Sequence, residues 1–145
     1  MLVAVTVAIH SNKLLNKDRE KLSKSKRNKG VTQTPELTRT QSKYIERMNN
    51  VINDHLKESD FSGALRDLEG NPVLRPDGSA FNHKKEVEDA YVGLKKITKG
   101  LGNSLKNPNL SGATRKIIQE NVDKGNYYLN RIEELFKVYG GINIE

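Results

Sequence analysis

The chain has 145 residues, which is enough for one domain of ordinary size and too few for two independent hydrophobic cores. Apolar residues make up only 34% of the sequence and charged residues 30%, so we expect part of the chain to stay outside any packed core. The absence of cysteine excludes disulfides, thiolate zinc sites and cysteine nucleophiles. A formal charge of +7 suggests a polyanionic partner.

The basic charge is concentrated near the N-terminus. Residues 1–40 contain nine Lys or Arg and three acidic residues, whereas residues 41–145 contain sixteen Lys or Arg and fifteen acidic residues. The opening run MLVAVTVAI is too short to span a bilayer as a helix and lacks the features of a secretory signal, so we interpret it as a cut end of a longer chain or a loosely held strand. We therefore predict a basic tail or linker over 1–37 and a folded domain over 38–142.

Three long amphipathic helices are predicted within this domain, over 40–58, 83–105 and from Ser111 to the glycines at 140 and 141. The caps available for their first turns are Thr38 or Thr40, Asn82 and Ser111. The apolar positions at helical spacing, which should form the core, are Ile45, Met48, Ile52, Leu56, Val87, Ala90, Tyr91, Leu94, Ile97, Leu101, Leu105, Ile118, Val122, Gly125, Leu129, Ile132, Leu135 and Phe136. No alternating strand pattern of useful length competes after residue 40. The predicted fold class is therefore all-α, a small helical bundle.

The least regular stretch lies between the first two of these helices and reads SDFSGALRDLEGNPVLRPDGSAFNHKKE. Phe61, Leu65 and Leu68 suggest a short helix at its start, and the glycines and prolines that follow predict turns. Loops held between rigid helices are where binding and catalytic groups concentrate. We therefore look for the functional site in this stretch.

The residues of this stretch and of three later segments resemble a known family. The segments are DFSGALRDLEGNPVLRPDG, FNHKKEVEDAYVGLKK, NSLKNPNLS and IEELFKVYGGI, which occur in the same order over about residues 42 to 142. They resemble the polymorphic toxin type 28 domain, an RNase module at the C-termini of secreted bacterial toxins. Because several separated segments agree, the resemblance covers nearly all of the proposed domain.

The resemblance implies a toxin domain that is secreted as part of a larger protein and cleaves RNA in the cytoplasm of a target cell. It also implies a cognate immunity protein, for which we expect an acidic surface that covers the loop from Asp60 to His83. The basic tail would join the domain to the N-terminal delivery portion, and we expect no membrane insertion by this domain. The resemblance assigns no catalytic residues, so these must come from the chemistry of the side chains.

RNA cleavage without a metal needs a base for the ribose 2'-hydroxyl proton, an acid for the leaving oxygen and a cation near the phosphate. Histidine suits the first two roles, and His55 and His83 are the histidines of the folded domain. His83 stands at the start of a predicted helix, where backbone amides favour an anion. Asp67 and Asp60 could orient a histidine or act as a base. The predicted catalytic residues are His83, His55 and Asp67.

Cations and an aromatic ring for substrate binding lie close to His83 in sequence. Arg66, Arg75, Lys84 and Lys85 could stabilise phosphate charge, and Phe81 could stack on an unpaired base.

The structural alternatives concern the candidate catalytic residues. His83 could satisfy a nearby backbone group, and His55 could pack against its neighbours. Asp60 could cap the short helix, and Asp67 could pair with Arg66 or Lys57.

Neither a metal nor a cofactor is predicted, because no HxxxH, HExxH or DxD cluster and no phosphate-binding glycine motif occurs. Two alternatives to a metal-independent ribonuclease stay open. One is a DNase toxin, which would require a divalent metal. The other is a non-enzymatic helical module that binds an acidic partner.

The predicted boundary can be tested by limited proteolysis of the whole chain. Since residues before Thr38 offer little apolar surface for a core, protease should remove residues 1 to about 35 and leave a helical fragment. The fragment is identified by mass spectrometry and its helicity by circular dichroism. Loss of helical structure on trimming would place the boundary elsewhere.

Overall fold

The structure is a computed structural model that describes residues 36–142. Its helices are α2 (Arg39–His55), α3 (Glu58–Leu68), α4 (His83–Ser104) and α5 (Gly112–Lys137). Within the described range no residue belongs to a strand, and a single antiparallel bridge joins Leu74 to Ala80. The prediction of an all-helical fold is confirmed for this part of the chain. Most of the predicted tail, residues 1–35, lies outside the described residues.

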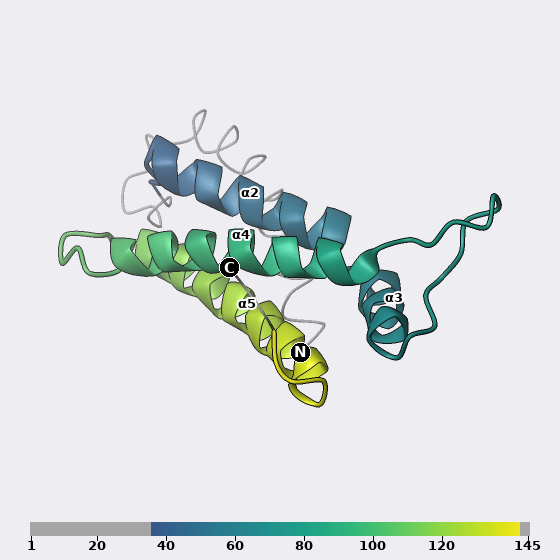
Figure 1. Cartoon of the computed structure of the whole chain (residues 1–145). Coiled ribbons are helices and arrows are strands. Elements are labelled where there is room, and N and C mark those ends of the chain that lie inside the picture. Colours follow the sequence, from purple (N-terminus) through teal and green to yellow (C-terminus); the bar gives the residue numbers. More distant parts are fainter. Residues whose placement is uncertain (1–35, 143–145) are drawn as a thin grey trace.

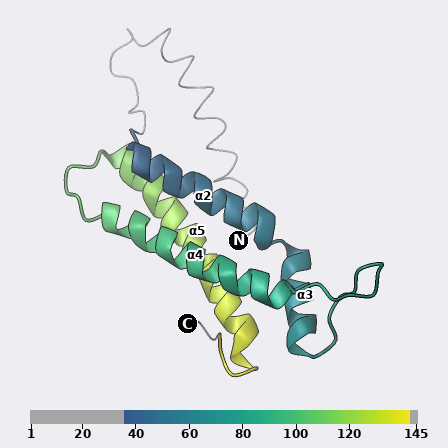
Figure 2. The same cartoon turned by 45° about the horizontal axis from the view of Figure 1, so that its top comes forward.

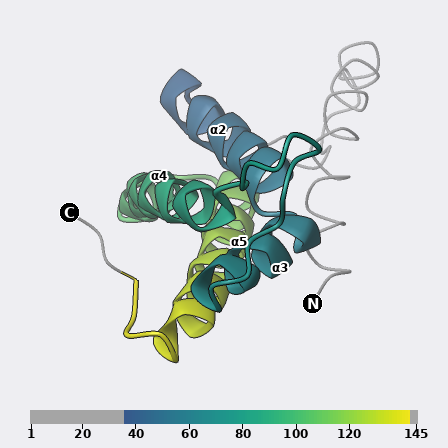
Figure 3. The ribbon, with the colours of Figure 1, turned by 45° about the vertical axis from the view of Figure 1, so that its right-hand side comes forward.

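Helix α4 occupies the centre of the bundle and contacts α2, α3 and α5 (Figure 1). Helix α2 runs alongside α4, α5 crosses α4 at an angle, and the short α3 packs against the N-terminal end of α4 (Figure 2). Figure 3 shows the same end of the bundle, where α3 lies between α5 and the loop that leads into α4. None of the described helices combines the length and the apolar character needed to cross a membrane.

Side-chain caps start three of the four helices. The side chains of Thr38, Asn82 and Ser111 each accept a hydrogen bond from a backbone amide in the first turn that follows. Such bonds satisfy amides that have no partner within the helix. After α5 ends, Gly140 and Gly141 take φ values of 96° and 88°, a conformation that favours glycine, and they turn the chain back toward the bundle.

The core is a single cluster of apolar side chains from all four helices. Those that are completely or almost completely buried are Met48, Ala64, Val87, Leu94, Leu101, Ile118, Ile132 and Phe136. Helix α3 contributes Phe61 and Ala64, which attach it to the end of the bundle. The burial of these side chains provides the main favourable contribution to folding.

Residues 69–82 form an exposed hairpin that projects from the bundle between α3 and α4 (Figures 1 and 2). The amide of Arg75 donates to the carbonyl of Ser79 at 2.7 Å, and the amide of Phe81 donates to that of Val73 at 2.9 Å. The hairpin therefore determines where Phe81 enters the structure, just before α4 begins.

One charged side chain is buried in the body of the bundle. Lys124 of α5 is 4% exposed, and its ammonium donates a hydrogen bond of 2.6 Å to Oδ1 of Asn49 on α2. Burial lowers the pKa of Lys124 from 10.5 to about 8, because removal from water disfavours the charged form. The folded state therefore holds this proton less tightly than the unfolded chain does.

Replacing Lys124 by Met should change how stability depends on pH. Between pH 8 and 10.5 the unfolded chain binds more protons at Lys124 than the folded protein does, so this residue makes the free energy of unfolding rise with pH. We compare the free energy of unfolding of Lys124→Met with that of the unchanged protein. The difference, variant minus unchanged protein, should be about 1–3 kcal/mol larger at pH 7.5 than at pH 10. Urea unfolding of both proteins at the two pH values measures this, and an equal difference at both would contradict it.

Candidate functional site

The first turn of α3 holds Asp60 in a fixed position. Lys57 precedes the helix, and its backbone amide donates to Oδ2 of Asp60 at 2.9 Å. The carboxylate is largely buried, with 11% of the side chain exposed. One oxygen is thus engaged by the start of the helix, while Oδ1 faces α4.

His83, the first residue of α4, lies between two carboxylates. Its Nδ1 is 3.8 Å from Oδ1 of Asp60 and 3.5 Å from Oε2 of Glu86, one helical turn further along α4. Both distances are longer than a good hydrogen bond. The Nδ1 atom is buried and makes no hydrogen bond within residues 36–142, although 16% of the side chain is exposed. A buried nitrogen between two carboxylates is an unusual arrangement that calls for a functional explanation.

The imidazole of His83 packs directly on Gly63 of α3. A Cβ atom at position 63 would lie 2.3 Å from Cδ2 and 2.5 Å from Cγ of His83, closer than side chains approach one another. Glycine therefore provides the space that the ring occupies. The position of His83 depends on the close approach of these two helices.

Phe81 and Arg75 form a short stack outside His83. The Phe81 ring lies 5.3 Å from the imidazole at an interplanar angle of 24°, and the Arg75 guanidinium lies 4.4 Å from the centre of the Phe81 ring. Nη1 of Arg75 also donates to the carbonyl of Ala80 at 2.7 Å. The hairpin thus brings one aromatic and one cationic predicted binding residue to the histidine.

The arrangement can do two kinds of chemistry. Asp60, His83 and Glu86 offer ligand atoms that all lie within 4.8 Å of one another, which would suit a divalent cation. The same three groups can carry and orient a proton, because a proton on Nδ1 would face both carboxylates and leave Nε2 free to act on a substrate. We refer to Asp60, His83 and Glu86 as the carboxylate–histidine cluster.

Two other predicted site residues meet beside this cluster. Oδ2 of Asp67 accepts a hydrogen bond of 2.8 Å from the backbone amide of Lys84, so Asp67 caps α4 and does not contact His83 through a hydrogen bond or ion pair. The ammonium of Lys84 lies 3.7 Å from Oε2 of Glu88. Asp67 is therefore bonded to the backbone of Lys84 at the start of α4, while the Lys84 side chain faces Glu88.

The remaining predicted residues make no hydrogen bond or ion pair with the cluster within the described residues. Lys85 forms an ion pair of 2.8 Å with Asp89, and this hydrogen bond raises the pKa of Lys85. Nε of Arg66 donates to the carbonyl of Asn71 at 2.9 Å and so holds the start of the hairpin. His55 is the last residue of α2 and is exposed.

The cluster contains residues that the sequence reasoning gave little weight. Glu86 is not among the predicted site residues, although its spacing of three from His83 places both on one face. Asp60 is considered as a group that could orient a histidine or act as a base, but it is not among the predicted catalytic residues. The role of Gly63 carries no sequence signal, because it depends on how closely two helices approach.

Comparison with known proteins agrees with the resemblance noted in the sequence. A family model described as bacterial toxin 28 matches residues 36–138. Over 104 residues the chain is 29% identical to the tRNA nuclease CdiA of Escherichia coli O6:K15:H31 (strain 536 / UPEC). The alignment covers 72% of this chain and 3% of that protein. The chain therefore corresponds to a small part of a much longer relative.

Replacing Gly63 by Ala should displace the His83 ring. Overpacking costs about 1–3 kcal/mol, and the higher helix propensity of Ala offsets up to about 1 kcal/mol of this. We expect a lower free energy of unfolding in urea and shifted ring signals of His83 in NMR spectra. In Gly93→Ala of α4 the added Cβ meets open space, so this control should be at least as stable as the unchanged protein and keep the His83 signals. Unshifted His83 signals in Gly63→Ala would contradict the packing described.

Proposed function

The chain belongs to the bacterial toxin 28 family, and from this premise we propose that it is the nuclease domain of an antibacterial toxin that cleaves RNA without a metal. The observation that carries the proposal is the buried Nδ1 of His83 between the carboxylates of Asp60 and Glu86. The likeness to part of a tRNA nuclease supports RNA as the substrate.

His83 acts in this proposal as the main proton carrier. With a proton on Nδ1 directed toward Asp60 and Glu86, the Nε2 lone pair accepts the proton of the ribose 2'-hydroxyl or, once protonated, donates to the leaving 5'-oxygen. Distances of 3.5 and 3.8 Å fit a site without substrate, since catalytic hydrogen bonds often tighten only on binding. The attack of the 2'-oxygen on phosphorus forms a cyclic phosphate and releases the 5'-hydroxyl.

Asp60 and Glu86 differ in how firmly they are held. Asp60 is largely buried and bonded to the Lys57 amide, so it orients the imidazole. The Glu86 side chain is 49% exposed, so it can turn toward substrate and serve as the second acid or base. The Arg75 guanidinium above Phe81 supplies a cation, and a base can stack on Phe81 only by displacing this guanidinium, because the other face of the ring lies on His83.

The wider biological role follows from the family and is also proposed. The domain would be delivered into target cells as part of a larger secreted toxin and act in their cytoplasm. In the producing cell an immunity protein with an acidic surface would cover the hairpin and the start of α4. Arg75 and Lys85 are both exposed, and Lys85 would have to exchange its ion pair with Asp89 for one with the immunity protein.

A metal-dependent nuclease is the second candidate, because the three ligand atoms of the carboxylate–histidine cluster lie within 4.8 Å of one another. The donor set fits a divalent cation, which would polarise the phosphate. Asp60, His83 and Glu86 would hold it, and Nδ1 of His83 would then be a ligand and not a proton carrier. The two candidates differ in their response to a chelator.

The test is cleavage of total RNA and of double-stranded DNA by the whole chain, with and without EDTA. We expect discrete RNA products in both conditions and no DNA products. His83→Ala should lower the rate of RNA cleavage roughly a hundredfold or more, the usual contribution of a general acid or base. Since His83 is a partly exposed first-turn residue, the variant should stay folded by circular dichroism.

The same assay distinguishes the alternatives. Cleavage that is lost in EDTA and restored by Mg²⁺ or Mn²⁺ would favour the metal-dependent candidate. We expect His55→Ala to keep most of the activity, because His55 is exposed at the end of α2. Near-normal cleavage by folded His83→Ala would remove His83 from the mechanism.

A further inference from the structure

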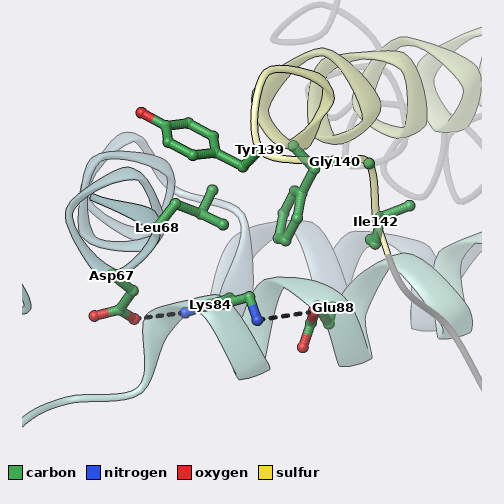
Figure 4. Close-up of a pocket in the computed structure, with 9 residues that line it drawn as sticks. Asp67, Leu68, Lys84, Glu88, Tyr139, Gly140 and Ile142 are labelled. Carbon is green, nitrogen blue, oxygen red and sulfur yellow. Dashed lines mark hydrogen bonds and ion pairs between the residues drawn. The ribbon is translucent and has the colours of Figure 1, made fainter. Parts of the chain in front are cut away.

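A second feature lies beside the carboxylate–histidine cluster, a pocket of about 560 Å³ between the ends of α3 and α5 and the start of α4 (Figure 4). Its volume falls in the usual range for small-molecule sites. Leu68 and Tyr139 line one side, and Lys84 and Glu88 line the opposite side, as Figure 4 shows. The polypeptide after α5 closes it with Gly140, Gly141 and Ile142.

The pocket and the cluster share the first turn of α4 and one face of α3. Lys84 follows His83 directly, and its backbone amide is bonded to Asp67, which also lines the pocket. Asp60, Gly63 and Asp67 are spaced by three and four residues, so they lie on one face of α3. The first two meet His83, and the third meets Lys84. The pocket and the cluster are therefore connected through the start of α4 and through α3.

The charges of the pocket argue against a phosphate as its ligand. Asp67 and Glu88 contribute two carboxylates, and Lys84 contributes the one ammonium among the lining residues. The Glu88 side chain is 18% exposed, so its charge is poorly screened by water. An anion would be repelled. A ligand that donates hydrogen bonds would be attracted instead.

The spacing of Lys84 and Glu88 indicates which donor group fits. Their charged ends lie 3.7 Å apart, longer than a tight ion pair, so each can turn to a ligand. An adjacent acceptor and donor pair matches the edge of guanine, whose N1–H and N2–H donate to a carboxylate while O6 accepts from an ammonium. Tyr139 is 41% exposed at the rim and offers a ring for stacking.

We propose that this pocket binds a guanine base of the RNA, next to the scissile phosphate at His83. Glu88 accepts from N1–H and N2–H, Lys84 donates to O6, and Tyr139 stacks on the ring. The inference rests on the proposed ribonuclease function for its role in substrate choice, but the pocket itself can be tested by binding alone. We call it the base pocket.

The binding experiment uses the whole chain carrying His83→Asn, which slows the cutting of RNA and keeps a planar side chain beside Gly63. The probes are two short single-stranded oligoribonucleotides that differ only by one guanine or uracil in an otherwise adenine sequence. We expect the guanine probe to bind about tenfold or more tightly, as a bidentate base contact typically provides. Adding Glu88→Gln, which keeps the size of the side chain, should abolish this preference. Equal binding of the two probes, or a preference that survives Glu88→Gln, would overturn the base pocket.

Cleavage mapping then tests the role in substrate choice. The products of the unchanged protein on these oligonucleotides should end beside the guanine, and Glu88→Gln should reduce the rate ratio of guanine to uracil substrates about tenfold. Tyr139→Phe should keep the preference, and Tyr139→Ala should weaken binding of both probes. As a matched control, Glu46→Gln makes the same change on the exposed face of α2 and should alter neither measurement.

The two proposals fail in different ways. If the binding preference for guanine depends on Glu88 but no RNA is cut, the ribonuclease function is wrong and the base pocket stands. If RNA is cut through His83 with no dependence on Glu88 in either assay, the ribonuclease function stands and the base pocket is wrong.

Discussion

The close approach of α3 to the first turn of α4 determines the whole functional end of the molecule. Two contacts maintain it, the packing of His83 on Gly63 and the hydrogen bond from the Lys84 amide to Asp67. The first requires a residue without a side chain, and the second satisfies an amide that the helix itself leaves unpaired. Together they place a histidine beside the carboxylate of Asp60, more than twenty positions earlier in the chain. Without this approach the chain would retain its bundle core but lose the site.

The hairpin before α4 is stabilised by different interactions from those that stabilise the bundle. Its residues are mostly exposed, and it is held by backbone hydrogen bonds and by the Arg66 and Arg75 side chains, which donate to carbonyls of the loop. A segment with few buried apolar contacts belongs to the less stable parts of a fold. Phe81 and Arg75 therefore sit on the more adaptable side of the site, while Asp60 and His83 sit on the rigid side. In the proposed ribonuclease, this division would suit a substrate that enters before the proposed catalytic groups tighten around it.

Most of the fold could be predicted from periodicity and capping. The predicted core residues of α2, α4 and α5 are buried, except that Leu105 and Leu135 are partly exposed near helix ends. Thr38, Asn82 and Ser111 are the caps because capping depends on local sequence. The first helix ends at His55, three residues before the predicted limit, since Leu56 leaves the helix to turn the chain into α3.

The site was harder to predict because its geometry is tertiary. His83 and Phe81 could be singled out by residue type and by their place before a helix, and the structure does bring them together. The approach of α3 to α4, however, has no signature in either segment taken alone. Asp67 shows the difficulty, since an aspartate near a predicted site looks equally suited to catalysis and to capping. Only the position of the Lys84 amide reveals that it caps α4.

The distribution of charge bears on how such a domain would select RNA. Residues 41–145 carry almost equal numbers of basic and acidic side chains, and two of the cations are already engaged, Lys85 of α4 by Asp89 and Arg131 of α5 by Glu58. Phosphate attraction alone would provide binding without sequence preference, and it needs many free cations. A nearly neutral surface with a polar pocket of defined shape instead favours binding that depends on the sequence of the RNA. In the proposed ribonuclease, discrimination would therefore come from contacts with bases and with the geometry of the backbone at His83, which favours selection of a particular substrate over binding of any polyanion.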